Sequence, residues 1–391
     1  MMTRLFSSTL IGLQAILTEI EVLVVNGLPQ CIIVGLAGTE VKEARERVYA
    51  AIKASGYVYP QTKKIINLAP SNVPKSGTCY DLGMAVGLLL AGQEVKKKCV
   101  WSDEIYLRET LFLGELSLDG RVKPVAGVLS SVKMARAQGF KRVVIPHENA
   151  DEAGLIGGIE ILCAGYLKEV MEGDLKFNMS VKSLPGQTLI QEIPEVDFAD
   201  IKGNMMGKRA MVIAAAGGHN VCLVGSPGSG KSMLAKALPS ILPPLSAEEC
   251  LEVTEIYSVA NNARTWDFNH TLKVARPFRS LHHTTSKISI IGGGGAGGGS
   301  PRQGGAAVGE ISLAHKGVLF LDEIAEFPRD TLEALRQPLE DKKISISRLH
   351  KKCTYPCDFI LVAAYNPCPC GFALDENRNC TCTVSERSRY E

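Results

Sequence analysis

Short β-type segments alternate with amphipathic helical segments over the first 175 residues of the chain. Ile20–Val25 and Cys31–Leu36 are rich in β-branched residues, and the Asn-Gly-Leu-Pro sequence between them is typical of a hairpin turn. Apolar residues then recur at helical spacing from Val41 to Ile52, and Gly56 favours the end of that helix. This alternation predicts an α+β domain over residues 1–175.

The remainder of this region continues the same mixture of elements. The first 17 residues lack a small-residue cleavage site, so we interpret them as a first strand region and not as a signal peptide. Asp81 is expected to cap a buried helix over Leu82–Ala91, and the alternating stretch around Asp119-Gly120 predicts a second hairpin. Three further elements are expected: a strand at Ile65–Leu68, a helix at Val125–Gln138 and a strand at Arg142–Ile145.

A polar stretch with two prolines, residues 176–196, interrupts the pattern and predicts a linker. A second domain, residues 197–391, then starts with a helix over Lys208–Ala216 and a buried strand over Asn220–Val224. Strands and helices alternate from there to about residue 366, which is typical of an α/β fold with a parallel sheet.

Composition narrows the class of protein. Of the 391 residues, 46% are hydrophobic and 21% are charged, which excludes a largely disordered chain. The net charge of +2 means that binding to nucleic acid would need a local basic patch. Twelve cysteines are too dilute for a disulfide framework, and the longest apolar run, near Gly83–Ala91, is too short to span a bilayer. We therefore expect a cytoplasmic protein with reduced thiols and no membrane contact.

Residues 225–232 read GSPGSGKS and match the phosphate-binding pattern G-x-x-x-x-G-K-[ST] in full, between a strand and a helix. The glycines let consecutive backbone N–H groups turn toward phosphate oxygens. Lys231 offers an ammonium to the phosphates, and Ser232 offers a hydroxyl to Mg²⁺. We predict that the whole loop binds ATP: Gly225, Ser226, Pro227, Gly228, Ser229, Gly230, Lys231 and Ser232.

Two later strands end in polar side chains. The apolar run Val318–Leu321 predicts a central parallel strand, and it is followed by Asp322 and Glu323. We expect Asp322 to hold Mg²⁺ and Glu323 to activate the attacking water. Another strand, Phe359–Ala364, is followed by Tyr365 and Asn366, whose amide can contact the terminal phosphate or that water. The predicted catalytic residues are thus Lys231, Glu323 and Asn366.

These motifs and the sequence around them resemble the magnesium-chelatase-like AAA+ ATPases, and in particular their ComM/YifB group. The segments that carry the resemblance include DFADIKG, RPFRSLHH, GEISLAHKGVLFLDEIAEFPRDTLEALRQPLED, TYPCDFILVAAYNPCPCG, NGLPQCIIVGL and INLAPSNVPKSG. By this resemblance, residues 225–232 are Walker A, Asp322 and Glu323 are Walker B, and Asn366 is sensor 1.

The resemblance implies an AAA+ core that assembles as a homo-hexameric ring, after an N-terminal domain with the Lon-protease-like (ribosomal protein S5 domain 2-like) fold. It also implies ATP-driven remodelling of branched or single-stranded DNA, as branch migration in natural transformation. The family continues into a helical lid with a sensor-2 arginine and a trans-acting arginine finger. The chain ends at Glu391, so we expect the lid to be absent and the chain to resemble a C-terminally truncated member.

Three other functions stay open at the level of sequence. The first is a magnesium-chelatase-type motor that acts on a protein partner. The second is a nucleotide-binding module without turnover, because the lid is missing. The third is a Lon-type peptidase, since Cys79 falls at the nucleophile position; the base position falls at Ser130 or Ser131, and Lys133 is out of register, which disfavours this activity.

Six of the twelve cysteines lie in the last 39 residues. The two C-x-C pairs Cys368/Cys370 and Cys380/Cys382 could close a structural Zn²⁺ site, although their spacing is tighter than usual, and simple reduced cysteines are the alternative. His282 and His283 follow Arg276 and Arg279, and this group could contact phosphate or a neighbouring subunit.

Overall fold

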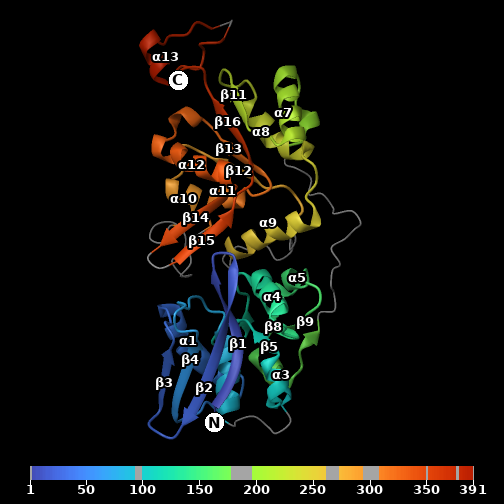
Figure 1. Cartoon of the computed structure of the whole chain (residues 1–391), viewed down its shortest axis with the longest axis vertical. Coiled ribbons are helices and arrows are strands. Elements are labelled where there is room, and N and C mark those ends of the chain that lie inside the picture. Colours follow the sequence, from blue (N-terminus) through green and yellow to red (C-terminus); the bar gives the residue numbers. More distant parts are fainter. Residues whose placement is uncertain are drawn as a thin grey trace. The chain divides into compact units, whose positions relative to one another are not determined.

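A computed structural model of the whole chain shows the fold (Figure 1). It describes residues 2–92, 99–177, 196–260, 273–293, 308–348, 351–375 and 378–390. The chain divides into two compact units. Unit 1 comprises Met1–Gly186, Tyr257–Leu272 and Gly295–Gly305, and unit 2 comprises Gln187–Ile256, Lys273–Gly294 and Ala306–Glu391. The expected linker, 176–196, begins with a two-residue strand, and its residues 178–195 lie outside the described residues.

Unit 1 is built on an eight-stranded sheet among the residues described, in the order β10-β9-β8-β5-β1-β2-β4-β3. The strands are β1 (Met2–Ile11), β2 (Gln14–Val25), β3 (Gln30–Val34), β4 (Lys63–Ala69), β5 (Thr110–Phe112), β8 (Arg142–Pro146), β9 (Glu160–Ala164) and β10 (Lys176–Phe177). The first strand region predicted from the sequence is confirmed as β1.

The hairpin expected between β2 and β3 is wrong. Strand β4 lies between them and pairs antiparallel with β2 and parallel with β3. The long hairpin of this unit is instead β1–β2, which turns at Gly12 with a φ of 62°. The Asn-Gly sequence therefore marks a turn, but pairing is decided by which strand buries its apolar face against β2.

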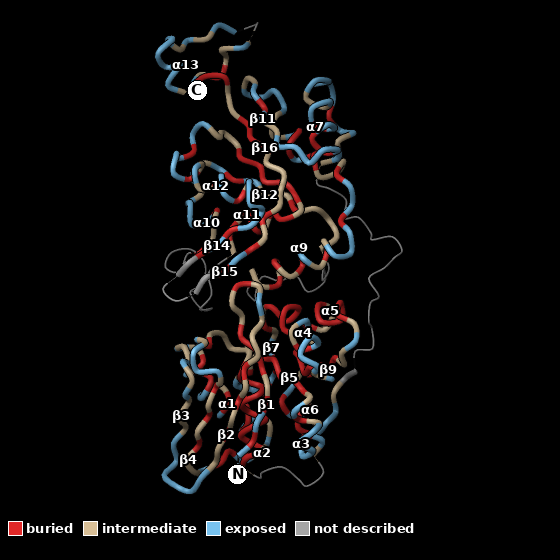
Figure 2. Tube along the Cα trace, in the orientation of Figure 1, coloured by how far each residue is buried: buried red, intermediate tan, exposed pale blue. Residues whose placement is uncertain are grey.

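The helices of unit 1 are α1 (Thr39–Ala54), α2 (Asp81–Ala91), α3 (Glu104–Arg108), α4 (Val128–Ala137), α5 (Ala150–Ala153) and α6 (Leu167–Glu172). Figure 2 shows the buried residues of this unit, and α2 is buried at all but one of its positions. Asp81 does not cap α2, because its carboxylate accepts hydrogen bonds from the Arg47 side chain and the Leu116 N–H. The hairpin around Gly120 is confirmed by β6 (Glu115–Leu116) and β7 (Val122–Lys123).

Unit 2 holds a parallel sheet in the order β11-β16-β13-β12, four strands among the described residues. These are β11 (Val221–Val224), β12 (Phe278–Leu281), β13 (Val318–Leu321) and β16 (Ile360–Tyr365). All four residues of β13 are buried, which confirms the predicted central strand. The strand predicted at Asn220–Val224 is present as β11, but the prediction that it is buried is wrong. β11 is an edge strand, and only its Leu223 is buried.

The other elements of unit 2 surround this sheet and extend from it. The helices are α7 (Met205–Gly217), α8 (Lys231–Ala237), α9 (Ala247–Ala260), α10 (Lys287–Ile291), α11 (Glu310–Leu313), α12 (Arg329–Asp341) and α13 (Val384–Tyr390). The last turn of α9, from Tyr257, is assigned to unit 1. Strands β14 (Lys343–Arg348) and β15 (Lys351–Pro356) form a hairpin. Over the ranges described, no helix combines the length and the apolar character needed to cross a bilayer.

Candidate functional site

The glycine-rich segment 225–230 joins the end of β11 to the start of α8. Gly228 and Gly230 have φ values of 78° and 85°, a left-handed conformation that other residues adopt only with strain. A Cβ on either glycine would meet no atom within 4 Å, so the requirement for glycine there is conformational and not steric. The loop therefore directs backbone N–H groups into the space in front of α8, where a phosphate group can bind.

The Lys231 ammonium lies over this loop. Its Nζ donates hydrogen bonds to the carbonyl oxygens of Gly225 (2.7 Å) and Ser226 (3.0 Å) and to Asn366 Oδ1 (3.2 Å). Burial lowers the pKa of Lys231 from its ordinary value, and the negative charge of Asp322 opposes this. The lysine is thus positioned between the phosphate loop and the end of β16.

The carboxylate of Asp322 meets the hydroxyl of Ser232. Ser232 Oγ donates to Asp322 Oδ2 at 3.2 Å, and the Glu323 N–H donates to Asp322 Oδ1 at 3.1 Å. The physical reason is the sheet: β13 and β11 are parallel to β16 on either side, so their carboxyl ends lie at one edge. Residues that are 90 positions apart in the sequence therefore come into contact.

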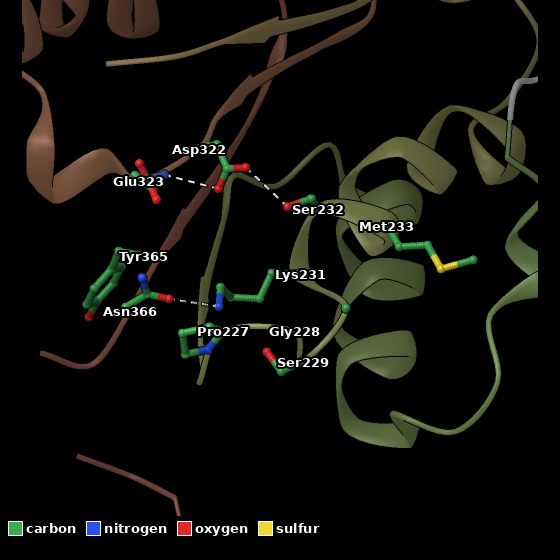
Figure 3. A pocket seen from close by; sticks show the side chains of 11 residues that line it. Pro227, Gly228, Ser229, Lys231, Ser232, Met233, Asp322, Glu323, Tyr365 and Asn366 are labelled. Carbon is green, nitrogen blue, oxygen red and sulfur yellow. Dashed lines mark hydrogen bonds between the residues drawn. The ribbon is translucent and has the colours of Figure 1, made fainter. Parts of the chain in front are cut away.

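These side chains line one cavity of about 340 Å³ (Figure 3). It is lined by Pro227, Gly228, Ser229, Gly230, Lys231, Ser232, Met233, Asp322, Glu323, Tyr365 and Asn366. Figure 3 shows Lys231 directed toward Asn366 and Ser232 toward Asp322. The cavity has the donor set that a nucleoside triphosphate with Mg²⁺ requires: a cation, a helix N-terminus, a hydroxyl and a carboxylate.

Sequence analysis missed that His282 and His283 face Glu323. His283 Nδ1 lies 3.2 Å and His282 Nε2 lies 3.8 Å from Glu323 Oε2. Strand β12 pairs with β13 so that Leu281 is opposite Leu321, and the histidines therefore follow at the level of Asp322 and Glu323. In the sequence, the histidines follow the apolar Leu281 just as Asp322 and Glu323 follow Leu321. Only the strand order shows that these two strand ends are adjacent.

The two arginines before these histidines have structural partners. Arg276 donates to the carbonyl oxygens of Pro243 and Lys316, and Arg279 Nε donates to Glu310 Oε2 at 2.6 Å. Both arginines therefore bond to other groups of the protein and do not offer the phosphate contact that the sequence suggested. The two histidines face the carboxylate of Glu323.

The four cysteines of the two C-x-C pairs come together. Their sulfur atoms all lie within 4.8 Å of one another, at Cys368, Cys370, Cys380 and Cys382. Backbone N–H groups of Phe372 and Thr381 lower the pKa of the Cys370 thiol to about 5, which favours its thiolate. The cluster is a candidate metal site of the tetrahedral thiolate type.

Cys79, at the position of a Lon-type nucleophile, has a raised pKa, unlike Cys370. Its thiol donates to the carbonyl oxygen of Ser8 at 3.2 Å. Burial raises the pKa of this thiol to about 12, and the charge of Asp81 adds to the increase. Ser131 is buried and its hydroxyl bonds to Ser8 and Gly127. A protonated, half-buried thiol is a poor nucleophile, so this geometry does not favour peptidase chemistry.

The parallel sheet with its phosphate loop and the polar residues at its carboxyl edge define an AAA+ type P-loop protein. Sequence comparison agrees: the family described as magnesium chelatase, subunit ChlI, matches residues 197–391, and the subunit ChlI of Mg-chelatase matches residues 20–149. The chain belongs to the magnesium-chelatase-like family that includes YifB and ComM.

Three relatives illustrate this similarity. The chain is 42% identical over 376 residues to the uncharacterized protein YifB of Salmonella typhimurium. This alignment covers 95% of the chain and 69% of YifB. The chain is 38% identical over 376 residues to the competence protein ComM of Haemophilus influenzae, and this alignment covers 94% of the chain and 69% of ComM. A shorter match, 31% identical over 134 residues, is to Lon protease 2 of Bacillus subtilis and covers 34% of this chain and 22% of that protein.

Proposed function

We propose that the chain is an ATP-binding and ATP-hydrolysing AAA+ motor that remodels branched DNA. The observation that supports it most is the convergence of Lys231, Asp322 and Asn366, from three separate segments, on the cavity of the phosphate loop. Membership of a magnesium chelatase family, whose ATPase is of the AAA+ type, supports the hydrolytic part of the proposal.

Each side chain has a role that its position supports. The phosphate loop and Lys231 bind the phosphates, and Ser232 and Asp322 hold Mg²⁺. Mg²⁺ held there would supply positive charge that offsets the negative charge of the phosphates. Glu323 orients the attacking water and takes its proton, because it lines the cavity beside Asp322. Asn366 contacts Lys231 and keeps its amide at the terminal phosphate position.

Support for a DNA substrate comes from a relative and not from the site itself. ComM of Haemophilus influenzae is a competence protein, and we extend from it to DNA branch migration by a homo-hexamer of this chain. Within the extended proposal, residues 1–175 form the Lon-protease-like domain, 176–196 the linker and 197–391 the ATPase core, in which the four-cysteine cluster holds structural Zn²⁺.

A magnesium-chelatase-type motor that remodels a protein partner is the second candidate. It is supported by the two family matches, both of which are to a magnesium chelatase subunit. This candidate predicts ATP hydrolysis that does not respond to DNA, whereas a binding module without turnover predicts ATP binding and no phosphate release.

Steady-state phosphate release from Mg-ATP, with and without a four-way DNA junction, tests these functions. We expect release that the junction increases, and we expect Glu323→Gln to lower it about a hundredfold or more while ATP binding is kept, because the general base is lost. Release that is unchanged by DNA would favour the protein-remodelling motor, and ATP binding without release would favour the binding module.

A matched pair of lysine variants controls the binding step. Lys231→Ala should weaken the affinity for a fluorescent ATP analogue by tenfold or more, since a charge-assisted contact contributes about 1.5–3 kcal/mol. Lys236→Ala removes the same charge from an exposed position of the same helix and should leave the affinity unchanged. Equal losses in both variants would contradict the assignment of Lys231.

A further inference from the structure

Three of the sulfur–sulfur distances in the four-cysteine cluster are close to those of a tetrahedral metal site. The sulfur–sulfur distances are 3.3 Å for Cys368–Cys370, 3.6 Å for Cys368–Cys380 and 3.4 Å for Cys370–Cys380. Four sulfur atoms at about 2.3 Å from a central Zn²⁺ lie about 3.8 Å apart at the tetrahedral angle. The cluster therefore needs to expand by only a few tenths of an ångström to hold the ion.

Backbone N–H groups point at two of the sulfur atoms. The Cys370 N–H points to Cys382 Sγ at 3.4 Å, and the Cys382 N–H points to Cys380 Sγ at 3.4 Å. Such N–H groups stabilise negative sulfur and orient it. Cys368 is fully buried, and the four thiols supply all the ligands that a closed structural site requires.

The C-terminal part of the segment that carries these cysteines lacks an apolar core of its own. Helix α13, which directly follows Cys382, contains no buried residue. A segment without an apolar core must gain its order from another source, and a metal ion coordinated by residues from both of its ends is one that small domains use. Here the ion would join residues 368–370 to residues 380–382.

The residues that flank the pair Cys368/Cys370 in the sequence also contact the phosphate loop. Just before it, Asn366 Oδ1 accepts the hydrogen bond from Lys231 Nζ. Just after it, Gly371 packs so closely on Pro227 that a Cβ at position 371 would lie 2.6 Å from Pro227 Cδ. Gly371 has a φ of 84°, so its backbone conformation also favours glycine.

We propose that Cys368, Cys370, Cys380 and Cys382 bind one structural Zn²⁺, and that this ion holds the segment Asn366–Gly371 against the phosphate loop. Loss of the ion loosens Pro227 and removes the support of the Asn366 amide. Metal occupancy thereby controls the order of the loop. The consequence for ATP affinity rests on the proposed function, whereas the order of the loop does not.

Metal content tests the first part. The purified full chain should contain about one zinc per molecule by inductively coupled plasma mass spectrometry, and Cys380→Ser should lower this about tenfold or more. Cys222→Ser removes an exposed cysteine outside the cluster and should leave the zinc content unchanged. Wild-type protein without zinc after purification and zinc addition, or with iron in its place, would overturn the proposal.

The proposed effect of the ion on the order of the phosphate loop is tested by hydrogen exchange without nucleotide. A negative result in this experiment is therefore distinct from a failure of ATP binding. In Cys380→Ser, peptides that contain residues 225–232 should exchange about threefold faster or more, whereas peptides from the buried strand β13 should not change. Gly371→Ala provides a variant that retains all four ligands: it should keep its zinc and still accelerate exchange in the phosphate loop. Unchanged exchange there in both variants would show that the metal does not control the loop.

Discussion

At the scale of single residues, the candidate site depends on side chains that hydrogen-bond to one another and to the phosphate loop. Lys231 shares its ammonium between two loop carbonyls and Asn366, so a phosphate must replace contacts that already exist. Exchange of one hydrogen bond for another changes the free energy little, whereas the charge on the phosphate strengthens the new contact. The lysine is thus held in place for binding at a small energetic cost.

Cys79 provides a prediction about reactivity. Because burial raises the pKa of its thiol to about 12, we expect it to resist alkylation by iodoacetamide at neutral pH in the folded protein. The exposed Cys222 should react much faster, and mass spectrometry of the labelled peptides would show the order. Rapid labelling of Cys79, together with casein cleavage that the labelling stops, would instead support a peptidase.

His315 provides a prediction about pH. Its Nδ1 accepts from the Asp358 N–H and its Nε2 faces Glu252, and burial lowers its pKa below the ordinary 6.5, with Lys316 acting in the same direction. A lowered folded-state pKa means that the unfolded state binds the proton more strongly. This contribution to stability is therefore complete above pH 6.5 and is lost as the pH falls through the lowered pKa.

Urea unfolding at a series of pH values would measure this effect. We expect the free energy of unfolding of the wild type to decrease on acidification below pH 6.5, and we expect His315→Gln to show a smaller decrease. The difference between the two curves isolates His315 from the carboxylates, which titrate in both proteins. Parallel curves would exclude a titrating role for this histidine.

At the scale of elements, the parallel sheet of unit 2 brings the functional residues together. The strands β11, β13 and β16 end at the same edge, and each delivers polar side chains there. Helix α8 begins at this edge with Lys231, so its N-terminus faces the same cavity. The position of these side chains therefore depends on the sheet core that supports them.

Phe320 on β13 allows that dependence to be tested. Its side chain is 1% exposed and stacks on Phe278 of β12, with ring centroids 6.2 Å apart. We expect Phe320→Ala to destabilise the protein by about 3–5 kcal/mol in chemical denaturation followed by circular dichroism, because it leaves a cavity in the sheet core. Phe320→Leu fills most of that cavity and should cost clearly less; equal losses would indicate that packing at this position is not the cause.

At the scale of the whole molecule, the proposal of a motor implies assembly of several copies. An AAA+ ring binds nucleotide between neighbouring subunits, and binding of ATP without hydrolysis stabilises such a ring by mass action. We expect Glu323→Gln with Mg-ATP to sediment as a hexamer at micromolar concentration in analytical ultracentrifugation.

Lys231→Ala at an ATP concentration that only the wild-type affinity can saturate should remain at the mass found without nucleotide, because its ATP binding is weakened. Assembly that is identical in both variants would mean that nucleotide does not control the oligomer. A monomer in every condition would contradict the ring for this chain.

Sequence reasoning identified the components of the site through local chemistry. The phosphate loop is a contiguous motif, so Gly225–Ser232 could be assigned without knowledge of the fold. Asp322 was expected at the carboxyl end of a parallel strand as a Mg²⁺ ligand, and the structure places it in contact with Ser232. The β2–β3 hairpin and the Asp81 cap were wrong, because a strand from elsewhere in the chain and the distant Arg47 compete successfully for the same groups.

The amino-acid sequence by itself determined where helices, strands and the phosphate loop form, because backbone conformation depends on neighbouring residues and on the spacing of apolar side chains. Tertiary structure alone decided the strand order, the approach of His283 to Glu323, the closure of the four cysteines and the contact of Gly371 with Pro227. These features join residues far apart in the chain or depend on distances of a few tenths of an ångström. Such contacts follow from how the elements pack together, which no local pattern contains.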